Sequence, residues 1–232
     1  MRLRDLSFAL FLAVTIDARP AEEPRVVLEH DHLVPVNPYW GDWHDRYTKE
    51  LQSLLKLDSN SYFFAQMVVR PSFSGEYAIR LHGAKGDTNI EETEKLFLTY
   101  SAASTNIFYA MAENNEKNKQ QKVTIAHTTF ELPKPLATRI YELWSRMLLR
   151  TRFPEGSKEA GDDGTTYEFG IWCRYGETWS PQERKSPLLF VELGESLISY
   201  CKATSAERPA AAKEIETRAA ELETYLTAHP SK

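Results

Sequence analysis

A stretch of alternating apolar and polar residues between residues 62 and 132 constrains the fold more than any other part of the sequence. Apolar side chains recur at every second position from Phe63 to Val69, and the alternation returns around Ile79 after a turn at residues 71–75. Further strands are predicted over residues 95–100, 106–111 and 122–132. The connections are too short for parallel neighbours, so the pattern predicts an antiparallel meander.

Helical patterns flank this region on both sides. Apolar side chains recur at spacings of three and four and predict a helix over residues 40–54. This stripe, aromatic at its start, consists of Trp40, Trp43, Tyr47, Leu51 and Leu54. Further helices are predicted over residues 135–150, 186–201 and 209–226, and a hairpin is predicted over residues 165–179. The predicted fold class is therefore α+β, with an antiparallel meander sheet of about five to seven strands and amphipathic helices on one face.

The composition agrees with one folded domain. Hydrophobic residues make up 42% of the chain and charged residues 26%, which is ordinary for a folded protein and does not indicate disorder. The predicted domain spans residues 22–232, divided into an N-terminal arm and helix (22–60), the meander sheet (61–132), and the later helices with their hairpin (133–232). No internal repeat interrupts it.

The first residues have the layout of a secretory signal peptide. Arg2 and Arg4 precede an apolar run at residues 6–16, which ends in a segment rich in small residues. The run is shorter than the roughly 20 residues that cross a bilayer, so no transmembrane anchor is expected in the mature chain. We expect residues 1–21 to be cleaved and the protein to be periplasmic or extracellular. The alternative is a buried N-terminal element of a cytosolic protein.

Charge and cysteine content exclude some classes of protein. The formal net charge is −5, so the chain offers no electropositive field for nucleic acid, and none is expected as a partner. Cys173 and Cys201 are too few for a disulfide scaffold. In an oxidising compartment they could form one bridge closing a loop of about 28 residues. Two separate buried thiols are the equal alternative.

Three segments near the C-terminus form a recognisable pattern: residues 163–169 (DGTTYEF), 179–181 (WSP) and 193–197 (LGESL). This pattern resembles the C-terminal module of an uncharacterised group of bacterial hypothetical proteins. The resemblance implies a fold element and no assigned activity. Physically, Asp163-Gly164 predicts a turn with a positive φ before a strand, and Gly194 predicts a close approach of a helix to the sheet.

Two sets of residues are candidates for binding. Trp172, Tyr175 and Trp179 could form an aromatic ligand surface, or could instead cover the sheet beneath helices. His30 and His32 lie two apart, so in an extended segment both imidazoles point the same way, as a metal site requires.

His44, Asp42 or Asp45 could complete the metal shell. The alternative is a polar N-terminal arm without a metal, and no other cofactor is indicated.

No pattern of residues supports a reaction, so no catalytic residue is assigned and an enzyme is the less favoured class. Glu168 and Glu177 would fit a glycosidase only if their carboxyl groups lie about 5 to 10 Å apart in the fold. His82 and His127 could act together only if the sheet brings them into register.

The leading hypothesis is an exported, non-catalytic protein that binds an unknown protein or component of the bacterial envelope. One alternative is an envelope metal-dependent hydrolase that uses the histidine pair. Another is an inhibitor or immunity-type protein, which the acidic net charge would suit if its target is basic.

Overall fold

The computed structural model describes residues 30–36, 42–57, 62–84, 87–117, 122–154 and 163–230. The predicted leader, residues 1–21, lies outside this part of the chain.

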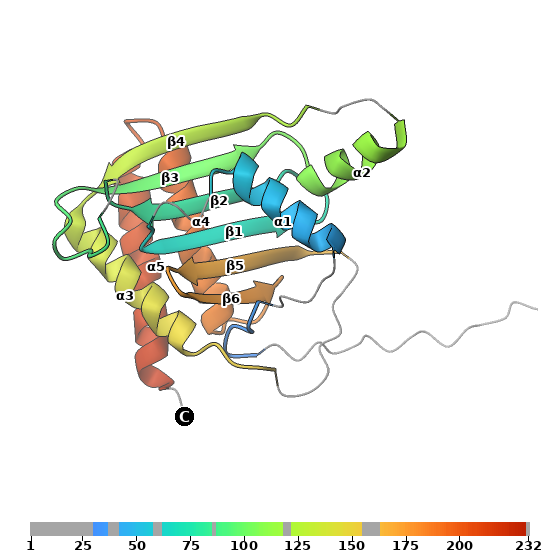
Figure 1. The fold of residues 1–232 in the computed structure, drawn as a ribbon. Coiled ribbons are helices and arrows are strands. Elements are labelled where there is room, and N and C mark those ends of the chain that lie inside the picture. The colour runs from blue at the N-terminus through green and yellow to red at the C-terminus, as the bar shows by residue number, and fades with distance from the viewer. Residues whose placement is uncertain are drawn as a thin grey trace, which may run out of the picture.

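One antiparallel sheet organises the described residues, with its strands in the order β4-β3-β2-β1-β5-β6 (Figure 1). The first four strands form a meander, and β5 and β6 form a hairpin that pairs with the other side of β1. The strands are β1 (Ala65–Pro71), β2 (Tyr77–His82), β3 (Leu96–Ala103), β4 (Ile125–Leu132), β5 (Thr165–Ile171) and β6 (Arg174–Trp179). The α+β meander predicted from the alternation is confirmed.

Three helices cover one face of the sheet, which we call the core face and which carries Ala65, Met67 and Val69 of β1. These helices are α3 (Lys134–Leu149), α4 (Ser186–Lys202) and α5 (Arg208–Ala228). Prolines in the first turn of each helix fit there because the first N–H groups have no partner within the helix. The apolar stripes of α3 and α4 meet the sheet directly, and α5 packs on those two helices.

An aromatic cluster fills the centre of this core. The ring of Phe190 in α4 stacks on Phe169 of β5 at 4.1 Å and meets Trp144 of α3 edge-on at 4.4 Å. All three side chains are fully buried. The indole N–H of Trp144 donates to the backbone oxygen of Gln66 at 3.1 Å, so the one polar atom of the cluster is satisfied.

Gly194 lets α4 approach the sheet closely, as its position in the sequence predicts. A Cβ atom at Gly194 would lie 2.4 Å from the sulfur of Met67, which is fully buried in β1. No side chain fits at that distance without movement, so this glycine sets the spacing between α4 and the sheet.

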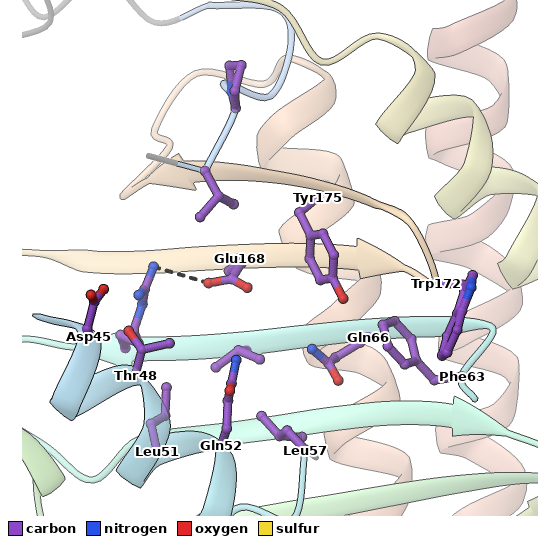
Figure 2. A pocket seen from close by; sticks show the side chains of 14 residues that line it. Asp45, Thr48, Leu51, Gln52, Leu57, Phe63, Gln66, Glu168, Trp172 and Tyr175 are labelled. Atoms are coloured by element: carbon purple, nitrogen blue, oxygen red, sulfur yellow. Dashed lines mark ion pairs between the residues drawn. The ribbon is translucent and has the colours of Figure 1, made fainter. Parts of the chain in front are cut away.

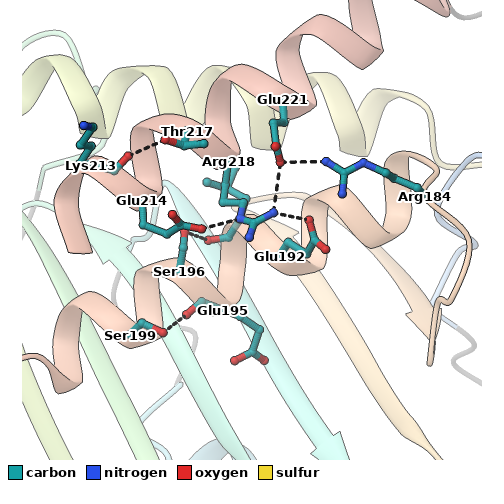
Figure 3. Close-up of polar contacts among 11 residues, drawn as sticks. Arg184, Glu192, Glu195, Ser196, Ser199, Lys213, Glu214, Thr217, Arg218 and Glu221 are labelled. Carbon is teal, nitrogen blue, oxygen red and sulfur yellow. Dashed lines mark hydrogen bonds and ion pairs between the residues drawn. The ribbon is translucent and has the colours of Figure 1, made fainter. Parts of the chain in front are cut away.

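Salt bridges tie α5 to α4 on the outside of the helical layer (Figure 3). Arg218 of α5 bonds Glu192 of α4 at 3.0 Å and also Glu214 and Glu221 of its own helix. Arg184, ahead of α4, bonds Glu221 at 3.2 Å. These side chains are partly exposed, so the network orients the helices and contributes little to stability.

Across the described ranges, no helix combines the length and the apolar character that crossing a membrane requires.

The strand predicted over residues 106–111 is wrong, because α2 (Ile107–Lys117) begins there. Asn106 accepts a hydrogen bond from the Tyr109 backbone N–H at 3.0 Å, as an N-cap residue does. The buried carboxylate of Glu76 accepts two more, from the N–H groups of Ile107 and Phe108 at 2.7 and 3.3 Å. These side chains satisfy the first turn of the helix, and the short alternation over residues 106–111 does not indicate them.

The other face of the sheet is covered by α1 (Asp42–Leu54), which lies across β1 and β2 in Figure 1. Tyr47 and Leu51 of α1 pack with Val68 and Ala78 in a second, smaller apolar cluster. The predicted stripe is therefore confirmed for these two helix residues, while the side chains of Trp40 and Trp43 lie outside the described residues. The helices thus occupy both faces, and not only the one that the sequence predicted.

Candidate functional site

The face of the sheet under α1, which we call the cleft face, has a polar centre. Gln66, Val68 and Arg70 of β1 point to this face because side chains alternate along a strand. Cross-strand pairing places Glu168 of β5 beside Val68, and Glu177 of β6 beside Glu168. The sheet thereby brings Arg70 together with two carboxylates that follow it by about a hundred positions in the sequence.

A cleft of about 770 Å³ opens between α1, the sheet and the N-terminal arm (Figure 2). Asp45, Thr48 and Gln52 line it from the helix, and Trp172 and Phe63 lie toward the opposite end. The remaining lining residues are Pro35, Val36, Leu51, Leu57, Gln66, Val68, Arg70, Glu168 and Tyr175. The volume falls within the ~300–1,000 Å³ that is usual for small-molecule sites.

At the centre of the cleft, a single arginine is shared by two carboxylates. Arg70 Nη2 lies 3.4 Å from Glu168 Oε2 and 3.4 Å from Glu177 Oε2. The side chains are 13%, 20% and 15% exposed respectively, so solvent screens them only in part. Burial raises the pKa of Glu168, and the charge of Arg70 opposes that rise.

The distances of Glu168 and Glu177 to Arg70 limit how far apart this pair of carboxylates, considered above for a glycosidase, can lie. Glu168 Oε2 and Glu177 Oε2 each lie 3.4 Å from Arg70 Nη2, so the separation of the two oxygens cannot exceed the upper limit of the glycosidase spacing; these distances set no lower limit on their separation. However, Glu168 lines the cleft, whereas Glu177 is not among the lining residues and pairs through its backbone with Val34 of the arm. Both carboxylates are bound to the same cation, which favours a positioning role over acid–base chemistry.

Gln66 is held in one orientation within the cleft. Its Oε1 accepts hydrogen bonds from Arg80 Nε at 3.1 Å and from Nη2 at 2.9 Å. The guanidinium of Arg80 also lies 5.0 Å above the ring of Phe63. With the amide oxygen committed to Arg80, the amide N–H₂ is the part of Gln66 that can serve a ligand.

Two of the three predicted aromatic site residues line the cleft. Trp172 is 49% exposed and stacks on Tyr62 at 4.9 Å with an interplanar angle of 28°. Tyr175 lies over Gly170, where a Cβ atom would be 2.7 Å from its ring. These rings come together from the β5–β6 turn and from β6, and they form an aromatic rim.

Trp179 has a different role. Its ring lies 2.4 Å from where a Cβ atom of Gly164 would be, so it covers the start of β5 and does not line the cleft. The prediction of a positive φ at Gly164 is wrong, because its φ lies outside that region. The glycine is needed there for the space that the indole occupies.

The arm at residues 30–36 closes one side of the cleft with Pro35 and Val36. Asp31 Oδ1 accepts hydrogen bonds from the backbone N–H and the hydroxyl of Ser186 at 3.1 and 2.9 Å, and Arg150 bonds its other oxygen at 3.3 Å. Val34 forms a backbone bridge with Glu177. Local sequence carries no signal for this attachment, because the partners of Asp31 are 155 and 119 residues away.

Of the three histidines predicted as metal ligands, the structure describes the side chains of His30 and His32. The rings of His30 and His32 lie 5.0 Å apart. Burial of His32, together with the charges of Arg152 and His30, lowers its pKa to about 4, so its imidazole is neutral at neutral pH, as a metal ligand must be. The side chain of His44 lies outside the described residues. Within the described ranges, no group of three or more His, Cys, Asp or Glu residues could hold a metal ion.

Both cysteines are free thiols. Cys201 is buried on α4, where burial raises its pKa to about 12, and its sulfur contacts the backbone oxygen of Leu98. Cys173 is exposed at the β5–β6 turn. The disulfide considered from the sequence is therefore not formed, and the two thiols are not both buried either.

His82 and His127 do not meet. His82 of β2 bonds Thr99 of β3 at 2.9 Å, whereas His127 of β4 bonds Ser101 of β3 at 2.8 Å. The two partners lie two positions apart along β3. Each histidine therefore belongs to a separate pair on the cleft face.

Comparisons with known proteins add no relatives. No protein-family model matches the chain, and no curated protein and no solved structure matches it either. The resemblance to the bacterial hypothetical-protein group therefore stays a prediction.

Proposed function

We propose that this chain is a non-catalytic binding protein that holds a small ligand in the cleft between α1 and the sheet. The observation that carries the proposal is the cleft itself. The ion pair of Arg70 with Glu168 lies at its base, and the aromatic rim lies at one end. Concave sites with apolar walls and a few fixed polar groups are the usual form of a ligand site.

Non-catalytic binding fits the chemistry of the lining better than a reaction does. A general base or a nucleophile needs a group that can approach the substrate and change its protonation state. Here Arg70 binds both Glu168 and Glu177, and Arg80 fixes the amide of Gln66. The charged and polar side chains at the centre of the cleft are therefore bound to other protein side chains. Such fixed groups supply orientation and specificity.

The experiment compares the wild-type chain with a variant whose cleft is filled. Thr48→Trp places a large ring between α1 and the sheet, whereas Thr227→Trp makes the same change at an exposed position of α5. Both proteins are screened by thermal shift against saccharides, amino acids, nucleosides, quaternary amines and carboxylates, because a ligand of the native state raises the melting temperature.

We expect at least one compound class to stabilise the wild-type and Thr227→Trp proteins but not Thr48→Trp. The proposal is rejected if no class stabilises the wild type, or if Thr48→Trp responds as strongly as the control.

Export to the bacterial envelope is the second part of the proposal, and it is supported by the signal-like residues 1–21. Edman sequencing of the protein from its natural host tests this part separately. An N-terminus near residue 22 would support export, and one at Met1 in a soluble internal fraction would contradict it.

A further inference from the structure

We infer that the ligand of the cleft is an uncharged saccharide whose ring stacks on Trp172 and whose hydroxyl groups bond the fixed polar side chains. The inference rests on the proposed function, because it names the class of ligand that the same cleft would hold.

The aromatic rim offers a flat surface of the kind that a sugar ring requires. One side of the Trp172 indole is covered by Tyr62, and about half of the side chain stays exposed beside the cleft. Tyr175, 42% exposed, extends this rim from β6. The C–H face of a pyranose ring is apolar and packs on such a surface, while its edge carries hydroxyl groups.

The charges in the cleft disfavour an ionic ligand of either sign. The positive charge of Arg70 already lies between Glu168 and Glu177, so an anion would compete with two carboxylates. A cation would approach the positive charge of Arg70 at the centre of the cleft, and among the described lining residues only the exposed carboxylate of Asp45, on α1, would attract it. An aromatic cage for a quaternary amine is also not formed, because Arg80 occupies the face of Phe63.

The remaining polar groups suit hydroxyl groups. The amide N–H₂ of Gln66 can donate a hydrogen bond. Glu168 can accept one through Oε1, because Arg70 binds its Oε2. Gln52 faces them from α1 and can do both, whereas the hydroxyl oxygen of Thr48 is buried. Paired donors and acceptors on both walls match the edge of a sugar, and a volume of about 770 Å³ accommodates a disaccharide.

Isothermal titration calorimetry of the full chain tests the inference with maltose, cellobiose and N,N′-diacetylchitobiose as probes, each up to millimolar concentration. Choline, phenylalanine and acetate are titrated as ligands of other classes. Trp172→Ala removes the stacking surface, and Phe153→Ala is the matched control because Phe153 is 80% exposed and does not line the cleft.

We expect at least one saccharide to bind, Trp172→Ala to weaken that binding by about tenfold or more, and Phe153→Ala to leave it unchanged. Circular dichroism shows whether each variant is folded, and the exposed position of Trp172 favours folding.

Two results overturn the inference while the proposed function stands: binding of choline, phenylalanine or acetate with no saccharide bound, or saccharide binding that Trp172→Ala leaves unchanged but Thr48→Trp abolishes. Absence of binding by every probe also overturns the inference. The proposed function is judged separately, by the wider thermal-shift screen and its Thr48→Trp comparison.

Discussion

Replacing Arg70 with methionine tests whether the shared arginine organises the cleft. Methionine keeps most of the length and the apolar stem but removes the charge. The substitution leaves Glu168 and Glu177 as neighbouring carboxylates on adjacent strands, 20% and 15% exposed, with no cation between them. Repulsion and incomplete hydration of these carboxylates then destabilise the folded state.

The magnitude follows from the distances and the burial. A charge pair at 4 Å interacts with about 4 kcal/mol at an effective dielectric constant of 20, and desolvation of the guanidinium offsets part of this. Removing one partner of a buried ion pair costs about 3 to 5 kcal/mol. Because all three side chains keep some exposure, we expect the lower end, about 3 kcal/mol, at neutral pH.

The loss of stability in Arg70→Met should be larger at neutral pH than at acidic pH. Burial already raises the pKa of Glu168, and Arg70 lowers it, so the variant raises this pKa further. A carboxyl group whose folded pKa lies above its unfolded pKa favours the folded state increasingly as the pH falls through the folded value. The difference in the free energy of unfolding between the wild type and Arg70→Met should therefore become smaller at acidic pH.

Urea unfolding at about pH 8 and about pH 5 measures both effects. Arg139→Met is the control, since Arg139 forms an exposed ion pair with Glu223 and should cost less than about 1 kcal/mol. Adding Glu168→Gln to Arg70→Met should recover about 1 kcal/mol at the higher pH. A loss that is the same at both pH values, or no larger than that of the control, would refute the account of the charge cluster.

Three further predictions concern other parts of the fold. Relative to His32→Leu, the wild type should lose up to about 3 kcal/mol of stability as the pH falls from about 6.5 to about 4, because the folded pKa of His32 is lowered to about 4; urea unfolding over that range would show it. Gly194→Ala should cost about 1 to 3 kcal/mol in urea unfolding by displacing Met67, and Met67→Ala in the same chain should relieve part of that strain. Glu76→Gln should cost about 2 kcal/mol in thermal unfolding, because the carboxylate serves Tyr47 and the first turn of α2; little change would contradict this role.

The sequence predicted the elements that carry a long periodic pattern. The stripes of α3 and α4 and the alternation of β1 and β2 are set by burial against one continuous core, so the period of the sequence follows the geometry. The prediction failed over residues 106–111, where six residues fit either period. There the outcome depended on Asn106 and on Glu76, which lies about 30 residues away in sequence.

The candidate site was predicted only in part. Trp172 and Tyr175 were identified because large aromatic residues stand out in any sequence, and the structure places both beside the cleft. Arg70 and Gln66 were missed, since a polar residue on a predicted strand is ordinarily a residue that faces water. Their importance comes from cross-strand partners, and strand pairing over long separations is not written in local sequence.

One feature of β1 nevertheless indicated that its second face is covered. Between Gln66 and Arg70, the side that should face water carries Val68, and the paired position on β2 carries Ala78. An antiparallel strand with one solvated face alternates cleanly, whereas apolar residues on both faces require a second covering layer. The aromatic stripe of α1 needs an apolar surface of its own, and Val68 with Ala78 supplies it. The polar residues on either side of that contact therefore lie at the edges of a helix–sheet interface, which is where a cleft can form.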